Sequence, residues 1–313
     1  MNVKTVLQAR SWNKRLLILL GILAATVHAS GQGVDDALKQ FNGRILVLRH
    51  PLQSNYQVYG PDGSVLSAAS EGPWTVYSGI RIDKVKRHAD GLRIEGRRTL
   101  FLFPQGRLTP MEFQILKNRI RPPFQPEMKL DLHLDSALNS AEDIHTALAR
   151  IFLMNTSDLL AGIPEFWRVF LRDRLAYDPS AQPAAEFSWH EPQPKQFGPL
   201  PSTAGAAVRT DRDENIQTVY HVGVEVKPPR PTYAPEPNYS DAARYEKFQG
   251  TLVVNLVIAK DGSIHQLHVI RPLGLGLDEQ AEARLQTWKF SPATRNGQPV
   301  AVEMNIEVSF NLY

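Results

Sequence analysis

Three polar residues alternate with leucines in the stretch "KLDLHLDS". Asp131, His133 and Asp135 would lie on one face of a strand, since alternate strand residues point the same way and are about 7 Å apart. Two carboxylates and an imidazole can together bind a divalent metal. The other interpretation is a surface strand whose leucines face the core while its polar residues face water. We favour the surface strand and keep these residues only as candidate metal ligands.

The remaining sequence contains little catalytic chemistry. It has no GxSxG, HExxH, phosphate-loop or GxGxxG motif, and it has no cysteine. His50, His88 and His145 have no partner residue at the spacing of a known motif. We therefore expect a protein that is not an enzyme and uses no cofactor. A metal-dependent enzyme within residues 41–175 is the alternative, and it depends on the Asp131, His133 and Asp135 set alone.

The N-terminus carries the basic excess of the chain. The 313 residues include 35 Lys and Arg against 32 Asp and Glu, and four of the basic residues precede residue 16, whereas residues 1–29 contain no acid. We therefore expect no nucleic-acid partner. The apolar run "LLILLGILAATV" would form a helix of about 18 Å, short of the ~30 Å of a bilayer core. Residues 1–29 are thus expected to be a secretory signal cleaved after Ala29, or a short retained anchor, and the protein to be periplasmic.

Three zones follow this leader. Residues 41–175 begin with short β-like runs, which predict an antiparallel meander, and continue with helices, one of which carries a capping box at Ser140 and Asp143. Residues 178–237 hold 11 of the 23 prolines and predict an extended linker, within which "VYHVGVEV" alternates and could pair as a strand. Residues 238–313 are expected to form a third, separate zone.

The third zone predicts a small α+β fold. Ser240 would cap a short helix, "TLVVNLVIAKDGSIHQLHVI" reads as a hairpin that turns at Asp261-Gly262, and "LDEQAEARLQTWKF" reads as an amphipathic helix that ends before Pro292. Asn296-Gly297 would then turn the chain into a last strand with an apolar residue at every second position. The predicted fold class is α+β: one antiparallel sheet with helices on one face, after a β-rich and helical region and a proline-rich linker.

These C-terminal residues resemble the C-terminal domain of the TonB family of energy transducers. The matching stretches are "PNYSDAARYEKFQG", "TLVVNLVIAKDGSI" and "LDEQAEARLQTWKFSPA", and the closing strand follows them. The resemblance covers about residues 225–313, and the proline-rich zone fits the family order of anchor, linker and C-terminal domain. Residues 41–175 lie outside it.

The resemblance implies a docking role. Family members extend across the periplasm from an inner-membrane motor complex driven by the proton-motive force, and they bind outer-membrane transporters. They add a short extended segment of the transporter to an edge of the small sheet, for which a terminal strand with free backbone groups is a template. The partner-binding residues implied here are Arg244, Tyr239, Val300, Val302, Met304, Ile306, Val308 and Phe310.

Two departures from the family affect what the resemblance implies. Arg244 stands where well-studied members carry a glutamine that meets the transporter segment, so an acidic segment would be favoured. The apolar run of residues 16–27 is short for a spanning anchor and lacks the histidine and serine that couple family anchors to the motor. A soluble periplasmic adaptor or envelope-assembly protein that uses the domain as a pairing module is therefore the alternative. Homodimerisation through the edge strand is a further candidate.

Overall fold

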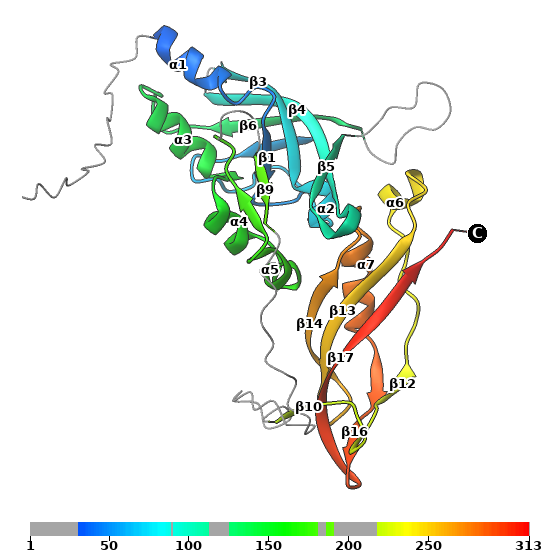
Figure 1. Ribbon diagram of the computed structural model, residues 1–313. Coiled ribbons are helices and arrows are strands. Elements are labelled where there is room, and N and C mark those ends of the chain that lie inside the picture. Colours follow the sequence, from blue (N-terminus) through cyan, green and yellow to red (C-terminus); the bar gives the residue numbers. More distant parts are fainter. Residues whose placement is uncertain (1–30, 89, 113–124, 181–185, 191–217, 313) are drawn as a thin grey trace, which may run out of the picture.

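The computed structural model describes residues 31–88, 90–112, 125–180, 186–190 and 218–312 (Figure 1). These residues form an N-terminal sheet, coloured blue to green, and a C-terminal sheet, coloured yellow to red, which meet at one end. The predicted leader, residues 1–29, lies outside the described residues. Within the described ranges, no helix has both the length and the apolar character needed to cross a membrane.

The N-terminal sheet has seven strands in the order β2-β6-β4-β3-β1-β7, with β5 also paired to β4. Their bounds are β1 Ile45–Leu48, β2 Tyr56–Tyr59, β3 Gly79–His88, β4 Gly91–Leu102, β5 Thr109–Glu112, β6 Glu127–His133 and β7 Phe152–Leu153. The predicted meander is wrong for β2, which pairs in parallel with β6. The reason is that β3 already has β1 on one edge and β4 on the other, so β2 must find a partner elsewhere.

Short helices cover this sheet and its junction with the C-terminal sheet. They are α1 Gly31–Lys39, α2 Trp74–Tyr77, α3 Ala141–Ala149, α4 Thr156–Gly162 and α5 Glu165–Leu171, with a 3-10 turn η1 Pro104–Gly106. The predicted capping box at Ser140 and Asp143 is confirmed at the start of α3. Helix α1 lies before residue 41, yet its Val34 and Leu38 are buried in the same core as α3. Two further strands, β8 Leu175–Tyr177 and β9 Phe187–Trp189, pair with each other.

The C-terminal sheet follows the order β11-β16-β17-β13-β14, with β10 paired to β17 as well. The elements are β10 Val219–His221, β11 Val226–Lys227, β12 Arg230–Tyr233, α6 Asp241–Tyr245, β13 Gly250–Ile258, β14 Ile264–Arg271, α7 Leu277–Leu285, β15 Lys289–Ser291, β16 Ala293–Arg295 and β17 Gln298–Phe310. The predicted order of helix, hairpin, helix and final strand is confirmed, as is the helix cap of Ser240, which accepts a hydrogen bond from the Ala243 N–H. Asn296 and Gly297 both have positive φ and form the predicted turn into β17.

Helix α7 is shorter than predicted. It ends at Leu285. The amphipathic pattern predicts a helix that includes Trp288 and ends before Pro292. The residues after Trp288 form β15, which pairs with β12 and so draws the chain out of the helix before the proline. Leu277, Ala281 and Leu285 are nonetheless fully buried, as the stripe predicted.

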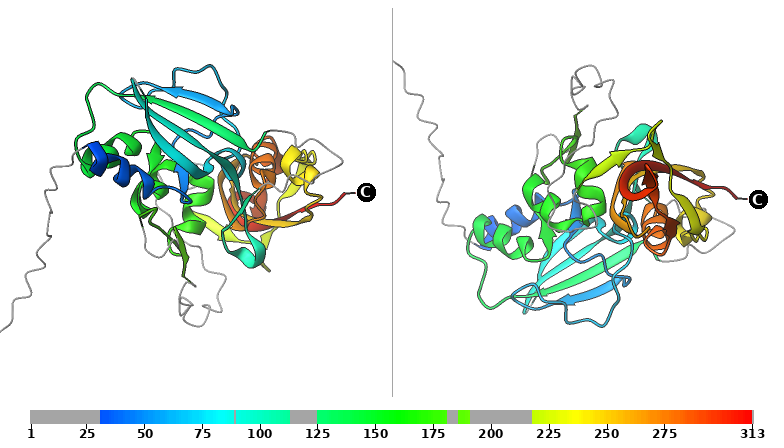
Figure 2. Two further views of the ribbon diagram at one scale, coloured as in Figure 1. Left: turned by 90° about the horizontal axis from the view of Figure 1, so that it is seen from above. Right: turned by 90° about the horizontal axis from the view of Figure 1, so that it is seen from below.

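The two sheets share one hydrophobic core. A single cluster joins aromatic residues around α2, α5 and the end of β4 to the apolar faces of β13, β17 and α7. The backbones also meet: the Phe103 N–H donates to the Leu273 carbonyl at 3.1 Å, and the Leu275 N–H donates to the Phe101 carbonyl at 3.0 Å. Gly274 makes this approach possible, because a Cβ there would lie 2.3 Å from the Phe101 carbonyl oxygen. Views from above and below show the two sheets in contact here (Figure 2).

The predicted proline-rich linker, residues 178–237, is described only in part, since residues 181–185 and 191–217 lie outside the described ranges. Its described parts are packed. Glu186 is buried and accepts a hydrogen bond from the Ile45 N–H, and the Phe187 ring packs edge-on against Phe101. At the other end, the predicted pairing of "VYHVGVEV" is confirmed by β10 and β11.

Candidate docking edge of the C-terminal sheet

Strand β17 has an open edge along its second half. It pairs with β16 at residues 298–300, with β10 at residues 301–303 and with β13 at residues 302–310. Because residues 302 and 303 pair with both β13 and β10, those two strands lie on opposite edges of β17. Among the described residues, no strand continues the row of β10 beside residues 304–310. This part of β17 therefore presents unpaired backbone groups, which is the condition for adding another strand.

The inward side chains of β17 divide into two groups. Val300, Val302, Val308 and Phe310 are at most 9 % exposed and belong to the core. Met304 and Ile306 pack against the same core but stay partly exposed. Of the six β17 residues predicted to bind a partner, these two are the ones whose side chains stay partly exposed.

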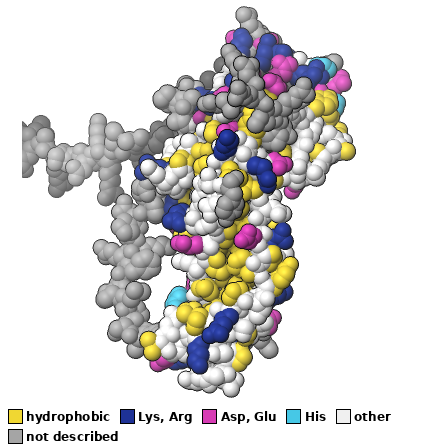
Figure 3. Space-filling view, turned by 90° about the vertical axis from the view of Figure 1, so that its right-hand side faces the viewer, with side chains coloured by type: hydrophobic (Ala, Val, Ile, Leu, Met, Phe, Trp, Pro, Cys, Tyr) yellow, Lys and Arg dark blue, Asp and Glu magenta, His cyan; other side chains and the backbone are white. Residues whose placement is uncertain are grey.

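An apolar band accompanies the open edge. Figure 3 faces the side of the molecule on which β17 lies in Figure 1, and hydrophobic side chains gather there in a band along the C-terminal sheet. Partly buried apolar residues of the C-terminal part that pack against the core include Tyr239, Tyr245, Phe248, Trp288, Met304 and Ile306. Trp288 is fixed by its indole N–H, which donates to the Pro235 carbonyl at 3.0 Å. The band gives a bound segment an apolar surface for every second side chain.

Tyr239 and Arg244 lie together at the C-terminal end of this edge. The Tyr239 ring meets Phe310 edge-on, with centroids 5.6 Å apart, and its hydroxyl donates to the Phe248 carbonyl. Burial raises the pKa of this hydroxyl. Arg244 is exposed, and its guanidinium carbon lies 5.9 Å from the centroid of the Tyr239 ring. The structure therefore brings the two predicted residues together beside the last residues of β17.

The outward face of the same strand is polar. Asn255 donates to Asn305 at 3.0 Å, Thr251 and Ser309 are 3.1 Å apart, and Arg271 is 3.9 Å from Glu307. An added strand would thus have an apolar band on one side and polar groups on the other. Such a site favours a segment in which apolar and polar side chains alternate.

Strand β10 occupies the edge next to this site, and the predicted site residues do not include it. It runs parallel to β17, with Val219 opposite Ala301 and His221 opposite Glu303. Val219 is buried in a small cluster with Val257, Ala259 and Ala301. The alternation of "VYHVGVEV" signalled a strand, but no local pattern could name its partner.

The N-terminal part of the chain holds the helix side of the C-terminal sheet. Thr75 is fully buried; its N–H and its hydroxyl donate to Glu279 at 2.9 and 2.8 Å, and its hydroxyl accepts from the Gly276 N–H at 2.8 Å. Asp278 is fully buried and accepts from the N–H groups of Leu273 and Gly274. Helix α5 contacts β14, the strand at the other side of the sheet. The contact between the two parts is therefore polar as well as apolar.

Burial and mutual repulsion shift the carboxyl groups of α7. Burial raises the pKa of Asp278 well above its usual range, and the neighbouring Glu279 adds to the shift. Burial also raises the pKa of Glu279, against the hydrogen bonds from Thr75. Burial, with a contribution from Glu279, raises the pKa of Glu282 to about 7. These three groups therefore favour the protonated state more than ordinary surface acids do.

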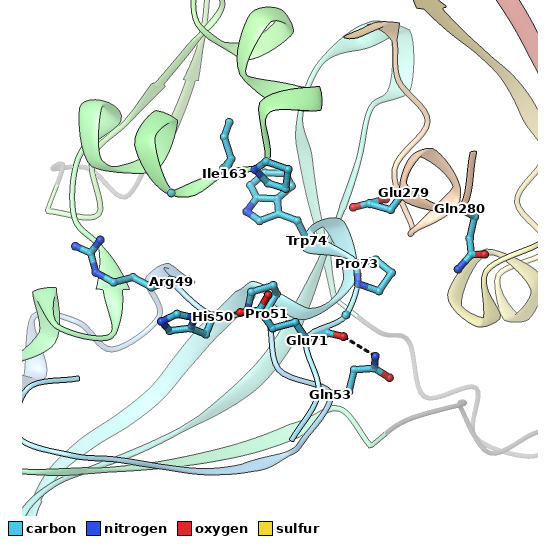
Figure 4. A pocket seen from close by; sticks show the side chains of 13 residues that line it. Arg49, His50, Pro51, Gln53, Glu71, Pro73, Trp74, Ile163, Glu279 and Gln280 are labelled. Carbon is cyan, nitrogen blue, oxygen red and sulfur yellow. Dashed lines mark hydrogen bonds and ion pairs between the residues drawn. The ribbon is translucent and has the colours of Figure 1, made fainter. Parts of the chain in front are cut away.

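A cavity of about 580 Å³ lies at the junction (Figure 4). Its walls come from the β1–α2 region, the α4–α5 turn and α7. Most of its polar groups already have partners: Arg49 pairs with Asp158 at 2.8 Å, His50 with Glu71 at 3.1 Å, and Gln53 donates to the Glu71 carbonyl at 2.9 Å, the dashed line of Figure 4. Most polar side chains that line the cavity thus already have a hydrogen-bond or ion-pair partner within the protein.

The candidate metal ligands are not gathered into a site. Asp131 accepts hydrogen bonds from Arg93 at 2.6 and 2.8 Å and from the Tyr56 hydroxyl at 2.8 Å. The hydrogen bond from Arg93 is the main reason that the pKa of Asp131 is lowered. His133 ends β6, and Asp135 lies beyond the strand. Within the described ranges, no group of three or more His, Asp or Glu is arranged to hold a metal ion.

Comparison with known proteins identifies the C-terminal part. Residues 235–312 match the family model described as Gram-negative bacterial TonB protein C-terminal. This part is similar to the TonB C-terminal domain. The match covers 78 of the 313 residues, from 235 to 312. No curated protein matches the chain.

The chain also matches a solved structure. One match is titled "Solution NMR structure of Pseudomonas aeruginosa TonB CTD", with 20% sequence identity, 29% of this chain and 92% of that chain covered, and a TM-score of 0.22. The family-model match confirms the expected resemblance to the TonB family for residues 235–312.

Proposed function

We propose that the protein is a periplasmic, TonB-like docking and energy-transducing protein that supports transport across the outer membrane. Its TonB C-terminal domain would bind a short extended segment of an outer-membrane TonB-dependent transporter by strand addition. The observation that carries this proposal is the open edge of β17 at residues 304–310, beside an apolar band, in a domain that matches the TonB C-terminal family.

The chemistry of the site supports a peptide partner. Unpaired backbone groups supply hydrogen bonds that do not depend on sequence, and the band at Met304 and Ile306 favours apolar side chains at alternate positions. Arg244 is exposed at the end of the edge and would favour an acidic residue in the segment. The function needs no catalytic group.

A second candidate function is a soluble periplasmic adaptor that uses the domain for pairing. The observation in its favour is the shared core, which fixes the TonB C-terminal domain to an N-terminal sheet that the family match does not cover. An energy transducer must remain attached to an inner-membrane motor complex, whereas an adaptor need not. Carbonate extraction of membranes separates the two: a chain retained with the inner membrane supports transduction, and a released chain supports the adaptor.

Titration of the purified protein with an N-terminal peptide from a TonB-dependent transporter tests the docking function. Binding should slow amide hydrogen exchange at residues 304–310 and leave β14 unchanged. Met304→Asp places a charge in the apolar band and should weaken binding about tenfold or more, equivalent to about 1.4 kcal/mol. Glu307→Gln, on the polar face of the same strand, is the matched control and should bind normally.

A folded protein that binds no such peptide would contradict the docking function. The same preparations answer the question of a homodimer. If a second copy occupies the edge, sedimentation should show a dimer that dissociates when the peptide is added.

A further inference from the structure

Strand β10 has the geometry of a strand already added to the docking edge. It lies outside the hairpins of the sheet, and it pairs in parallel with residues 301–303 of β17 on the edge opposite β13. Residues 304–310, the open part of the edge, follow in the same row. A segment that binds the open edge would therefore form hydrogen bonds with the same edge of β17 that β10 uses.

The buried anchor of β10 lies apart from the main core, whereas Tyr220 packs against that core and Val226 of β11 is buried in it. Val219 packs in a small cluster with Val257, Ala259 and Ala301. Arg295 lies over the Tyr220 ring, 5.2 Å from its centroid, and pairs with Glu225 at 2.8 Å. Strand β11 then pairs with β16 through Val226 and Lys227. Two short strands thus hold the tip of the β16–β17 hairpin from outside.

Residues 221–225, between β10 and the buried Val226, are exposed. Val222 is 40 % exposed, and Val224, in the turn between β10 and β11, is fully exposed. Each of the two strands has at most three residues. Such short pairing is weak and opens locally at low cost compared with the nine-residue pairing of β13 with β17.

We propose that β10 is an internal strand ligand of β17, which competes with extended segments for the acceptor edge. While β10 is paired, an incoming segment is limited to residues 304–310. When β10 leaves, the acceptor edge extends to residue 301, and a longer segment can pair. This inference rests on the proposed docking function for its biological meaning, but it concerns only this chain's own residues and can be tested without a transporter.

Two variants control whether β10 is paired with β17: one should release the strand and the other should fix it. Val219→Ser removes the buried anchor and should release it. His221→Cys combined with Glu303→Cys should fix it, because these residues are direct neighbours on the two strands, adjacent strands are about 4.8 Å apart, and the chain has no other cysteine. Val224→Ser, at the exposed turn, is the control for the loss of a valine in the same segment.

Hydrogen exchange decides whether β10 holds the edge. Amides of residues 301–303 that face β10 should be protected in the wild type and in the Val224→Ser control. Val219→Ser should lower their protection about tenfold or more, and the oxidised double-cysteine variant should raise it. Equal exchange in Val219→Ser and in the wild type would overturn the proposal.

A synthetic peptide of residues 218–227 decides whether the edge accepts a strand in competition. The peptide should bind Val219→Ser at least about fivefold more tightly than the wild type, since less of the edge is occupied. It should bind the oxidised double-cysteine variant at least about fivefold more weakly than the reduced variant, because only residues 304–310 of the edge then stay open. Equal binding to the oxidised and reduced forms would place the peptide elsewhere and overturn the proposal. Failure of the transporter peptide alone, with these results intact, would refute the docking function and leave the competition in place.

Discussion

Thr75→Val is the substitution that most directly tests the contact between the N-terminal sheet and the TonB C-terminal domain. Valine keeps the volume of threonine and the backbone N–H bond to Glu279, but it removes the hydroxyl. Two interactions are lost: the 2.8 Å hydrogen bond that the hydroxyl donates to Glu279, and the 2.8 Å bond that it accepts from the Gly276 N–H. The change therefore isolates the polar part of the junction.

The expected magnitude follows from those two interactions. A hydrogen bond to a charged group contributes about 1.5–3 kcal/mol, and an orphaned buried N–H costs about 1–3 kcal/mol. The added methyl group offsets about 0.8 kcal/mol. Glu279 is partly exposed and can recover some hydration, so the lower part of the range applies. We expect the free energy of unfolding to fall by about 2–4 kcal/mol.

Urea denaturation, followed by tryptophan fluorescence and circular dichroism, measures this change. Thr287→Val is the control, because Thr287 is exposed and its hydroxyl donates only to the Arg284 carbonyl at 2.7 Å. The control should shift stability by less than about 0.5 kcal/mol. The shared core predicts one cooperative transition for both sheets. A loss below about 1 kcal/mol in Thr75→Val, or separate transitions of which only one shifts, would refute the reasoning.

Three further outcomes are expected. The folded pKa of Glu282, about 7, lies above its ordinary value of 4.5, so the folded state binds the proton more tightly and stability falls as pH rises from about 4.5 to about 7. Glu282→Gln should remove up to about 3 kcal/mol of this fall in stability, which urea denaturation at pH 5 and pH 8 would measure. A variant whose stability falls as steeply with pH would contradict the assignment of the fall to Glu282. Trp288→Ala should cost about 2–3 kcal/mol in the same assay, less than for a fully buried indole, because Trp288 is partly exposed. Arg244→Ala should change stability by under about 0.5 kcal/mol and weaken binding of an acidic peptide, and an equal loss of stability in the Arg244 and Trp288 variants would place one of them wrongly.

The local patterns of the sequence predicted most of the C-terminal elements. Alternation from Val300 to Leu312 predicted β17, which ends at Phe310, Asn296-Gly297 predicted its entry turn, and Ser240 predicted the cap of α6. These signals are readable because they depend on residues two to four positions apart. The boundary of α7 was misjudged because the pairing of β15 with β12 ends the helix, and that pairing joins residues as far apart as Arg230 and Ser291.

The docking site shows the same division. Sequence alone named the strand and the pair Tyr239 and Arg244, because a family pattern marked them. It could not show that Met304 and Ile306 are the inward residues left partly exposed, or that β10 takes the first part of the edge. Which edge stays open depends on every other strand that competes for it, and strand partners are chosen by tertiary packing across long separations.

The sequence by itself therefore determined α6, the β13–β14 hairpin, the start of α7 and the strand β17 with the face that it buries. Only the tertiary structure decided that β2 pairs with β6, that both sheets share one core, and that Thr75 meets Glu279 across 204 positions of the chain. The physical reason is that side-chain periodicity is a property of neighbouring residues, whereas the pairing of edges and the closure of a core are properties of the whole chain.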